Sequence, residues 1–181
     1  YGVSISFVQN NEWEKANGIS ALKAQNHFKE NFALLMSDHV FNPKTLIEIQ
    51  KFKLQEEECV LAVDKNLDGV LDIEDTTKVM VKAGRAIALN KHLDKYNAYD
   101  TGMFVCTPNI FEVLKKTTSK GKNSLSDGMR LLVSDNKLRT FDNKGRFWAD
   151  CDTWEDIKFA KKKFIKSLSK SEDGMISKQF N

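Results

Sequence analysis

Two groups of acidic residues carry the strongest chemical signal in the sequence. Asp38 follows the apolar run 32–36, and Asp150 and Asp152 follow the predicted strand 146–149. Residues two apart on a strand share a face, so Asp150 and Asp152 are expected to point the same way. Carboxylates at strand ends suit Mg²⁺, which keeps its other positions for water and phosphate oxygens. We therefore expect a magnesium site here, with simple helix capping by Asp38 and Asp152 as the alternative.

A histidine, His39, stands directly beside Asp38. Neighbouring residues of a strand face opposite sides, so its ring is expected to point away from the aspartate. We interpret His39 as a supporting or structural residue and expect no histidine or serine nucleophile.

Apolar runs alternate with amphipathic segments along the chain. Runs typical of strands occur at 3–8, 32–36, 59–63, 79–81, 87–89, 103–106, 138–141 and 146–149. Helical spacing predicts helices that begin near Asn17, Pro43, Ser126 and Thr153, and one through Phe111 and Leu114. Such alternation predicts an α/β fold with a mixed, mainly parallel sheet flanked by helices, Rossmann-like, and with a hairpin at 79–89.

Composition excludes several classes of protein. The 181 residues include 28 basic and 25 acidic side chains, a net charge of +3, which argues against a nucleic-acid partner. No apolar run approaches the roughly 20 residues that a membrane span needs. Three cysteines without CxxC spacing suit core positions and the cytoplasm. Lysines crowd the segment 158–170, where they form either a solvated face or a surface for an anionic membrane.

Four segments, in this order and separation, resemble the nucleotidyltransferases that activate sugar and alcohol phosphates. The resemblance is strongest to the inositol-1-phosphate cytidylyltransferase domain of the bifunctional enzymes that make di-myo-inositol phosphate, and it covers essentially the whole chain. The segments are Asn17-Gly18-Ile19-Ser20-Ala21-Leu22, Leu35-Met36-Ser37-Asp38-His39, Asp100-Thr101-Gly102-Met103-Phe104-Val105-Cys106-Thr107-Pro108 and Trp148-Ala149-Asp150-Cys151-Asp152-Thr153-Trp154-Glu155-Asp156.

The resemblance implies roles for the first two segments. Asn17, Gly18 and Ser20 match residues that lie against the base and ribose of the nucleotide, where a glycine lets the backbone approach a ring closely. A plain turn before a helix is the alternative for Asn17 and Gly18. Asp38 and Asp152 match the two metal-binding carboxylates, Asp38 also lying at the nucleotide, and Asp150 is a third candidate ligand.

The resemblance also implies an acceptor site. Asp100, Thr101 and Gly102 match a strand start that faces the phosphorylated acceptor, with Asp100 binding its hydroxyls. Lys78 is a candidate catalytic contact to phosphate, and Lys91 is a weaker one. A loop-to-strand turn and solvated lysines are the alternatives.

The implied reaction transfers a cytidylyl group from CTP to inositol 1-phosphate and releases pyrophosphate. It proceeds by in-line attack at the α-phosphorus with Mg²⁺ between the carboxylates. Alternatives in the same class are another alcohol phosphate or a sugar 1-phosphate as acceptor. From a different class, a calcium-binding or structural module is the alternative.

One family feature does not occur within the 181 residues. The family opens with a strand and a glycine-rich loop that binds the triphosphate, whereas the nine glycines here are scattered. We therefore expect an N-terminally incomplete domain, with 1–168 as its C-terminal two-thirds. We also expect weak CTP binding and no transferase activity by the chain alone. Residues 169–181 resemble a linker towards an absent membrane domain, which implies a cytoplasmic position at the inner face of a membrane.

Residues 64–75 fit an EF-hand calcium loop, with acids or amides at positions one, three and five and Gly69 at position six. An EF-hand needs a helix on each side, whereas the flanking runs 59–63 and 79–81 are typical of strands. We therefore predict an acidic turn between strands that binds no calcium.

Overall fold

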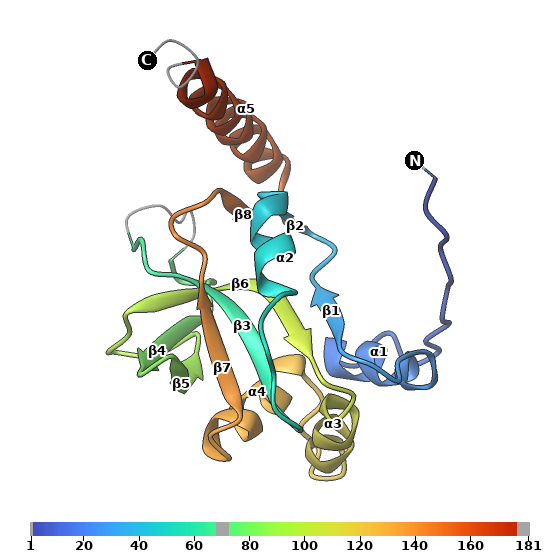
Figure 1. Cartoon of the computed structure of the whole chain (residues 1–181). Coiled ribbons are helices and arrows are strands. Elements are labelled where there is room, and N and C mark those ends of the chain that lie inside the picture. Colours follow the sequence, from blue (N-terminus) through green and yellow to red (C-terminus); the bar gives the residue numbers. More distant parts are fainter. Residues whose placement is uncertain (1, 68–72, 177–181) are drawn as a thin grey trace.

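A computed structural model describes residues 2–67 and 73–176, with side chains as far as Ile165 (Figure 1). Six strands form one sheet in the order β1-β6-β3-β7-β5-β4, and β4 also pairs with β6, so that five of them close into a barrel. The strands of this sheet are β1 (Phe32–Leu35), β3 (Cys59–Asp64), β4 (Lys78–Lys82), β5 (Arg85–Asn90), β6 (Ala98–Cys106) and β7 (Leu138–Asp142).

The prediction of a mainly parallel sheet is wrong. Among the described strands only β3 and β7 run parallel, and every other pairing is antiparallel. The continuous apolar run of β3 has another cause. Leu61 packs in the core cluster on one side of the strand and Val60 in the cluster on the other side. Burial on both faces therefore reflects the cover over each face and not the direction of the neighbouring strand.

Strand β6 is nine residues long, which lets it pair with three other strands of the sheet. One edge of β6 pairs with β3. The other edge pairs with β4 at Ala98 and Tyr99 and with β1 from Met103 to Cys106. The barrel closes between β5 and β7, where Arg85 lies opposite Arg139.

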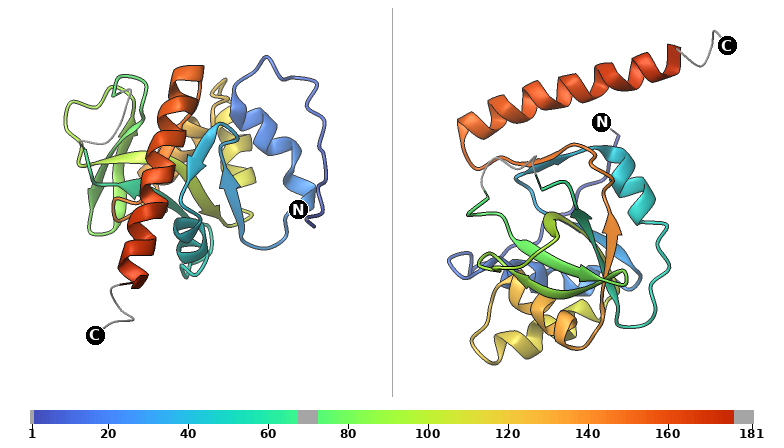
Figure 2. Two further views of the ribbon diagram at one scale, coloured as in Figure 1. Left: turned by 90° about the horizontal axis from the view of Figure 1, so that it is seen from above. Right: turned by 90° about the vertical axis from the view of Figure 1, so that its left-hand side faces the viewer.

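Helices cover the barrel on two sides (Figures 1 and 2). On one side α1, α3 and α4 contact one another, and α4 packs on β5. On the other side α2 contributes Ile49 to the second core cluster. These helices are α1 (Asn17–Lys23), α2 (Pro43–Ile49), α3 (Ile110–Thr118) and α4 (Leu125–Ser134), and the short 3-10 helix η1 (Gln25–His27) follows α1. Each α-helix begins within a few residues of its predicted position.

A second, two-stranded sheet pairs β2 (His39–Phe41) with β8 (Trp148–Asp150). The chain then enters α5 (Trp154–Ile176), which lies beyond this small sheet as seen from the barrel (Figure 2). The Thr153 hydroxyl accepts a hydrogen bond from the Asp156 N–H, and the Asp156 carboxylate accepts one from the Thr153 N–H, so the predicted helix start is confirmed. Among the described residues, no helix combines the length and apolar character that a membrane crossing requires.

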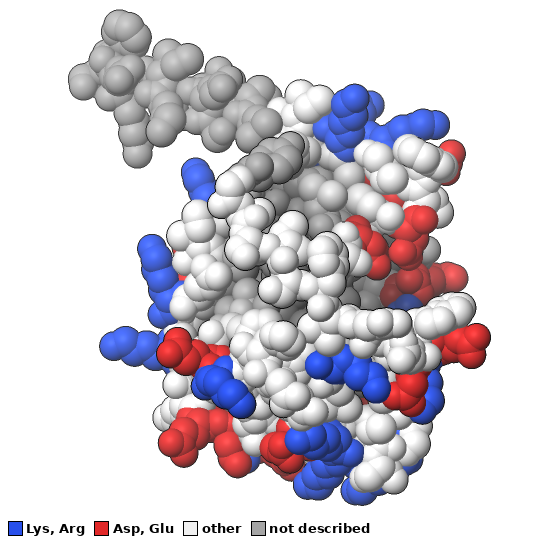
Figure 3. Space-filling view, turned by 90° about the vertical axis from the view of Figure 1, so that its right-hand side faces the viewer, with Lys and Arg blue, Asp and Glu red and all other residues white. Residues whose placement is uncertain are grey.

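Two predicted strands at the amino end differ from the structure. Residues 3–8 form no strand, and Val3, Ile5 and Phe7 are exposed. Their alternation suits a strand, but no neighbouring strand pairs with them among the described residues. Strand β1 was expected to be covered on both faces, whereas its four residues are half-buried. Within the described part of the chain β1 pairs only with β6. The side of the molecule on which α1 and the amino-terminal segment lie is uncharged in its middle (Figure 3).

The predicted strands on either side of the acidic turn are confirmed as β3 and β4. Asp64 ends β3 with both carboxylate oxygens occupied: Oδ1 accepts from the Asn66 N–H at 3.0 Å and Oδ2 from Trp148 Nε1 at 2.8 Å. Residues 68–72 of this turn lie outside the described residues. The absence of calcium binding stays a prediction.

Candidate active site

A cleft opens between the barrel, the small sheet and the amino ends of α1 and α4. Residues with charged, amide or imidazole side chains line the cleft and come from all these parts of the structure. They are Asn17, His39, Asp75, Lys91, Asp100 and Asp150. Thr76, Thr77 and Trp148 also line the cleft. All four sequence segments that carry the family resemblance therefore reach this one cleft.

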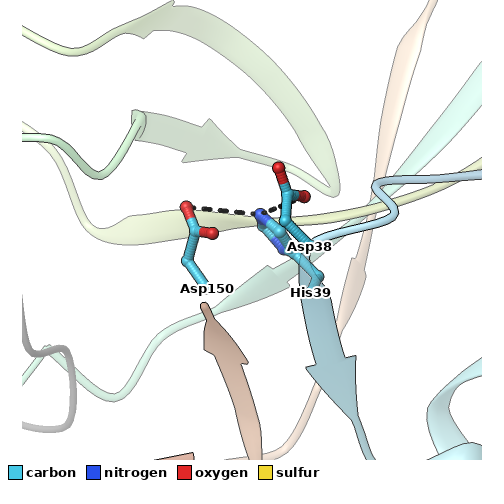
Figure 4. Close-up of side chains that lie close together, drawn as sticks. All are labelled: Asp38, His39 and Asp150. Carbon is cyan, nitrogen blue, oxygen red and sulfur yellow. Dashed lines mark ion pairs between the residues drawn. The ribbon is translucent and has the colours of Figure 1, made fainter. Parts of the chain in front are cut away.

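The pairing of β2 with β8 builds the acidic side of the cleft. It sets His39 directly opposite Asp150, and the N–H of Cys151 donates to the Asp38 carbonyl oxygen at 3.0 Å. As a result, His39 Nε2 lies 3.5 Å from Asp150 Oδ2 and 3.9 Å from Asp38 Oδ1 (Figure 4). The prediction that His39 points away from Asp38 is wrong, because Asp38 precedes β2 and the strand alternation does not extend to it.

Two groups of side chains have ligand atoms close enough to share a metal ion, and Asp150 belongs to both. One group is Asp38, His39 and Asp150, and the other is Asp75, Asp150 and Asp152. Within each group all ligand atoms lie within 4.8 Å of one another. Asp38 and Asp152, the pair emphasised from the sequence, fall in different groups because β8 ends at Asp150.

The electrostatics of Asp150 favour a cation. Burial raises the pKa of its carboxyl, His39 lowers it, and the neighbouring Asp152 and Asp38 raise it again. Like charges held this close oppose ionisation, and a divalent cation relieves the repulsion. The carboxylate oxygens present therefore fit the Mg²⁺ that the family resemblance implies.

The start of β6 lies against the His39 ring and also lines the cleft. The Asp100 carboxylate accepts a hydrogen bond from the Gly102 N–H at 2.8 Å, and burial raises its pKa to about 6, against lowering by that hydrogen bond and by His39. Asp100 and Gly102 line the cleft, whereas Thr101 is fully buried. The Thr101 hydroxyl donates to the Ala62 carbonyl at 2.8 Å, which leaves the Thr101 residue outside direct reach of a ligand.

Of the three nucleotide candidates in α1, only Asn17 lines the cleft. Its side-chain oxygen accepts from the Leu125 N–H at 2.9 Å, at the first turn of α4. Gly18 is buried, and a Cβ there would lie 2.5 Å from the Asn123 carbonyl oxygen. The structure thus gives this glycine a packing reason. Ser20 is exposed, accepts from Asn10 Nδ2 at 2.9 Å and lines a separate apolar hollow.

The two candidate lysines occupy different environments. Lys78 is buried, and its Nζ donates to the carbonyl oxygens of Ile73 at 2.8 Å and Lys91 at 2.6 Å. The Lys91 side chain instead lines the cleft, where it pairs with Asp75. Lys91, the weaker candidate from the sequence, therefore lines the cleft, whereas Lys78 does not. Asp75 was not predicted as a site residue, because the acidic segment 64–75 was interpreted as a pattern resembling a calcium loop.

Comparison with known proteins gives a consistent picture. No family model matches the chain. A "Bifunctional IPC transferase and DIPP synthase" of Aquifex aeolicus (strain VF5) is 34% identical over 175 residues, which cover 96% of this chain and 39% of that protein. Proteins of the same description from Archaeoglobus fulgidus and Thermococcus kodakarensis are 34% and 33% identical, covering 99% and 100% of this chain and 35% and 40% of theirs.

Solved structures agree with these relatives. The inositol-1-phosphate CTP transferase from T. maritima has a TM-score of 0.71 and 29% identity, covering 81% of this chain and 60% of its own. A putative glucose-1-phosphate thymidylyltransferase from Bacillus anthracis has a TM-score of 0.69 at 15% identity, covering 88% of this chain and 64% of its own, and shows the fold alone.

The chain spans between 35 and 40% of the length of the three bifunctional relatives named above. The alignments nevertheless run along nearly all of its 181 residues, and both solved structures share its fold. The chain has a nucleotidyltransferase fold and is a homologue of the IPC transferase domain of the bifunctional IPC transferase and DIPP synthases.

Proposed function

We propose that the cleft is the active site of a cytidylyltransferase that joins CTP to inositol 1-phosphate and releases pyrophosphate. The observation that supports this most is the convergence of four distant sequence segments on one cleft, represented there by Asn17, His39, Asp100 and Asp150. Homologues described as IPC transferases, and one solved as an inositol-1-phosphate CTP transferase, give the substrates.

Mg²⁺ would be held by Asp38 and Asp150, with Asp152 as a further candidate ligand near Asp150. When bound, the ion neutralises charge that develops on the phosphates during displacement at the α-phosphorus. The protein's own part is to orient these carboxylates, and the β2–β8 ladder does this by fixing their spacing.

The start of β6 would hold the acceptor. The Asp100 carboxylate, which lines the cleft together with Gly102, can accept hydrogen bonds from ring hydroxyls. Lys91 supplies a cation for the acceptor phosphate once its pairing with Asp75 is exchanged. Asn17 is placed for the nucleotide at the amino end of α4, where backbone N–H groups favour anions.

We further propose that the catalytic domain covers residues 1–168 and that 169–181 lead towards a membrane-embedded partner domain. The bifunctional description of the relatives supports this arrangement. Lys158, Lys161, Lys162 and Lys163 belong to α5, which lies apart from the barrel and so can face an anionic cytoplasmic leaflet.

The test is a panel assay of pyrophosphate release by the whole gene product and by the 181-residue chain in parallel. Five nucleoside triphosphates are crossed with inositol 1-phosphate, glycerol phosphate, phosphocholine and glucose 1-phosphate. We expect the highest kcat/KM for CTP with inositol 1-phosphate. A higher kcat/KM with another acceptor would make that acceptor the substrate in place of inositol 1-phosphate. No pyrophosphate release by the whole gene product with any pair would refute the transferase assignment.

A further inference from the structure

The hydrogen bond of His39 determines which ring nitrogen carries the proton. Nδ1 lies 2.9 Å from the carbonyl oxygen of Thr101. A carbonyl oxygen only accepts hydrogen bonds, so Nδ1 is the protonated nitrogen. In the neutral imidazole the other nitrogen, Nε2, then presents a lone pair.

That lone pair faces two carboxylates. Nε2 is 3.5 Å from Asp150 Oδ2 and 3.9 Å from Asp38 Oδ1 (Figure 4). Bonds of about 2.0–2.2 Å to one ion, about 90–130° apart, place two donor atoms about 3–4 Å from each other. The nitrogen and the carboxylate oxygens are therefore spaced as ligands of one cation, with no change of backbone.

The ring is held in this orientation from several sides. Gly102 leaves room for it, because a Cβ there would lie 2.4 Å from Nδ1. Trp148 lies against the ring with centroids 6.2 Å apart, and the His39 side chain is only 12% exposed. A histidine whose second ring nitrogen donates to a backbone carbonyl is the usual arrangement around a protein-bound metal.

From this geometry we propose that His39 Nε2 is a metal ligand, so that the cation of the cleft is bound by one nitrogen and by oxygens of Asp38 and Asp150. The proposal rests on the proposed function, because it concerns the cation of the same site. An imidazole ligand suits Mn²⁺, Co²⁺ or Zn²⁺ better than Mg²⁺, which prefers oxygen ligands. We therefore expect the site to prefer Mn²⁺ to Mg²⁺.

The direct test is pulsed EPR of the 181-residue chain with one equivalent of MnCl₂. Coordination by His39 predicts ¹⁴N modulation of the Mn²⁺ echo. This modulation should disappear in His39→Gln and persist in the matched control His92→Gln, whose histidine is exposed. Calorimetric titration should show Mn²⁺ affinity falling about 10- to 100-fold in His39→Gln, the loss common for a disrupted metal environment. Unchanged circular dichroism and thermal unfolding would show that this variant folds.

Three outcomes would overturn the proposal: Mn²⁺ bound without nitrogen coupling, coupling that survives in His39→Gln, or no Mn²⁺ binding. The first would mean that the cation is held by the carboxylates without the imidazole. Failure of the proposed function has a separate signature, namely nitrogen coupling in the chain while the whole gene product releases pyrophosphate with no substrate pair. Turnover without nitrogen coupling would refute the ligand role alone.

Discussion

At the scale of single residues, sequence motifs locate most of the acids in and beside the cleft but miss Asp75, which lines it. Asp38, Asp100 and Asp150 are all named by the motifs, and the structure brings Asp150 to the centre of both metal-capable groups. The family resemblance favoured Asp38 and Asp152 as the metal pair, whereas in the structure β8 ends at Asp150 and Asp152 shares a metal-capable group with Asp75 and Asp150. Lys91 and Lys78 are likewise separated only by tertiary contacts, which no local pattern reports.

The carboxyl of Asp100 should make stability depend on pH. Its folded pKa of about 6 exceeds the unfolded value of 3.8, so the folded state binds more protons between these values. The protonated Asp100 carboxyl therefore makes its full contribution to the free energy of unfolding below about pH 4. As the pH rises through about 6 this contribution is lost, which lowers the free energy of unfolding by roughly 2–3 kcal/mol.

Urea unfolding in EDTA at pH 4.5 and pH 7.5 checks this contribution. Asp100→Asn should become more stable relative to the parent protein as pH rises, and the exposed control Asp135→Asn should not. A parallel pH dependence in the parent and Asp100→Asn would contradict the raised pKa.

At the scale of elements, helix starts and buried strands were predictable because capping, spacing and apolar runs are local. Strand direction was not predictable. An apolar run such as 59–63 indicates that both faces of the strand are buried, but it does not indicate whether the neighbouring strands run parallel or antiparallel. Register is equally invisible in the sequence, and it has a chemical consequence for two of the cysteines.

Cys59 on β3 lies opposite Cys106 on β6. The backbone hydrogen bond beside them joins the flanking residues, from the Thr107 N–H to the Glu58 carbonyl oxygen, so the two cysteines form a non-hydrogen-bonded pair. Side chains are closest at such pairs, within the range of a disulfide. A hydrogen bond that the Cys106 thiol makes to Cys59, together with burial, holds the pKa of the Cys106 thiol well above its usual value, so oxidation should be slow.

We predict that diamide links Cys59 to Cys106, with a mass loss of two hydrogens and one cross-linked peptide. Cys151→Ala should form the same link, whereas Cys59→Ala should not. Preferential linkage through the half-buried Cys151 would show that the β3–β6 register differs from the one described.

At the scale of the whole molecule, the closure of the barrel was not predictable. It pairs Arg85 with Arg139, which are 54 residues apart in the sequence and carry the same charge. Arg85 lies opposite Arg139, and Glu58 contacts both guanidinium groups, Arg85 at 2.8 Å and Arg139 at 3.6 Å. Like charges opposite each other on neighbouring strands are destabilising, so the buried Glu58 makes this closure possible.

Replacing Glu58 with glutamine should therefore lower the free energy of unfolding by about 3–5 kcal/mol, the cost of breaking a buried ion pair. Glu112→Gln, which breaks an exposed pair with Lys115, should cost less than about 1 kcal/mol. Denaturant unfolding of both variants measures the difference, and equal losses would mean that Glu58 is not what closes the barrel.

The central claim is that the cleft around Asp150 is where cytidylyl transfer takes place. The most direct measurement is the rate of pyrophosphate release from CTP and inositol 1-phosphate by the whole gene product and two charge-matched variants. Asp150→Asn should lower kcat by about 100-fold or more, because the carboxylate shared by both metal-capable groups is lost. Asp135→Asn, at an exposed position after α4, should leave the rate unchanged. A folded Asp150→Asn variant with the parent rate would contradict the claim.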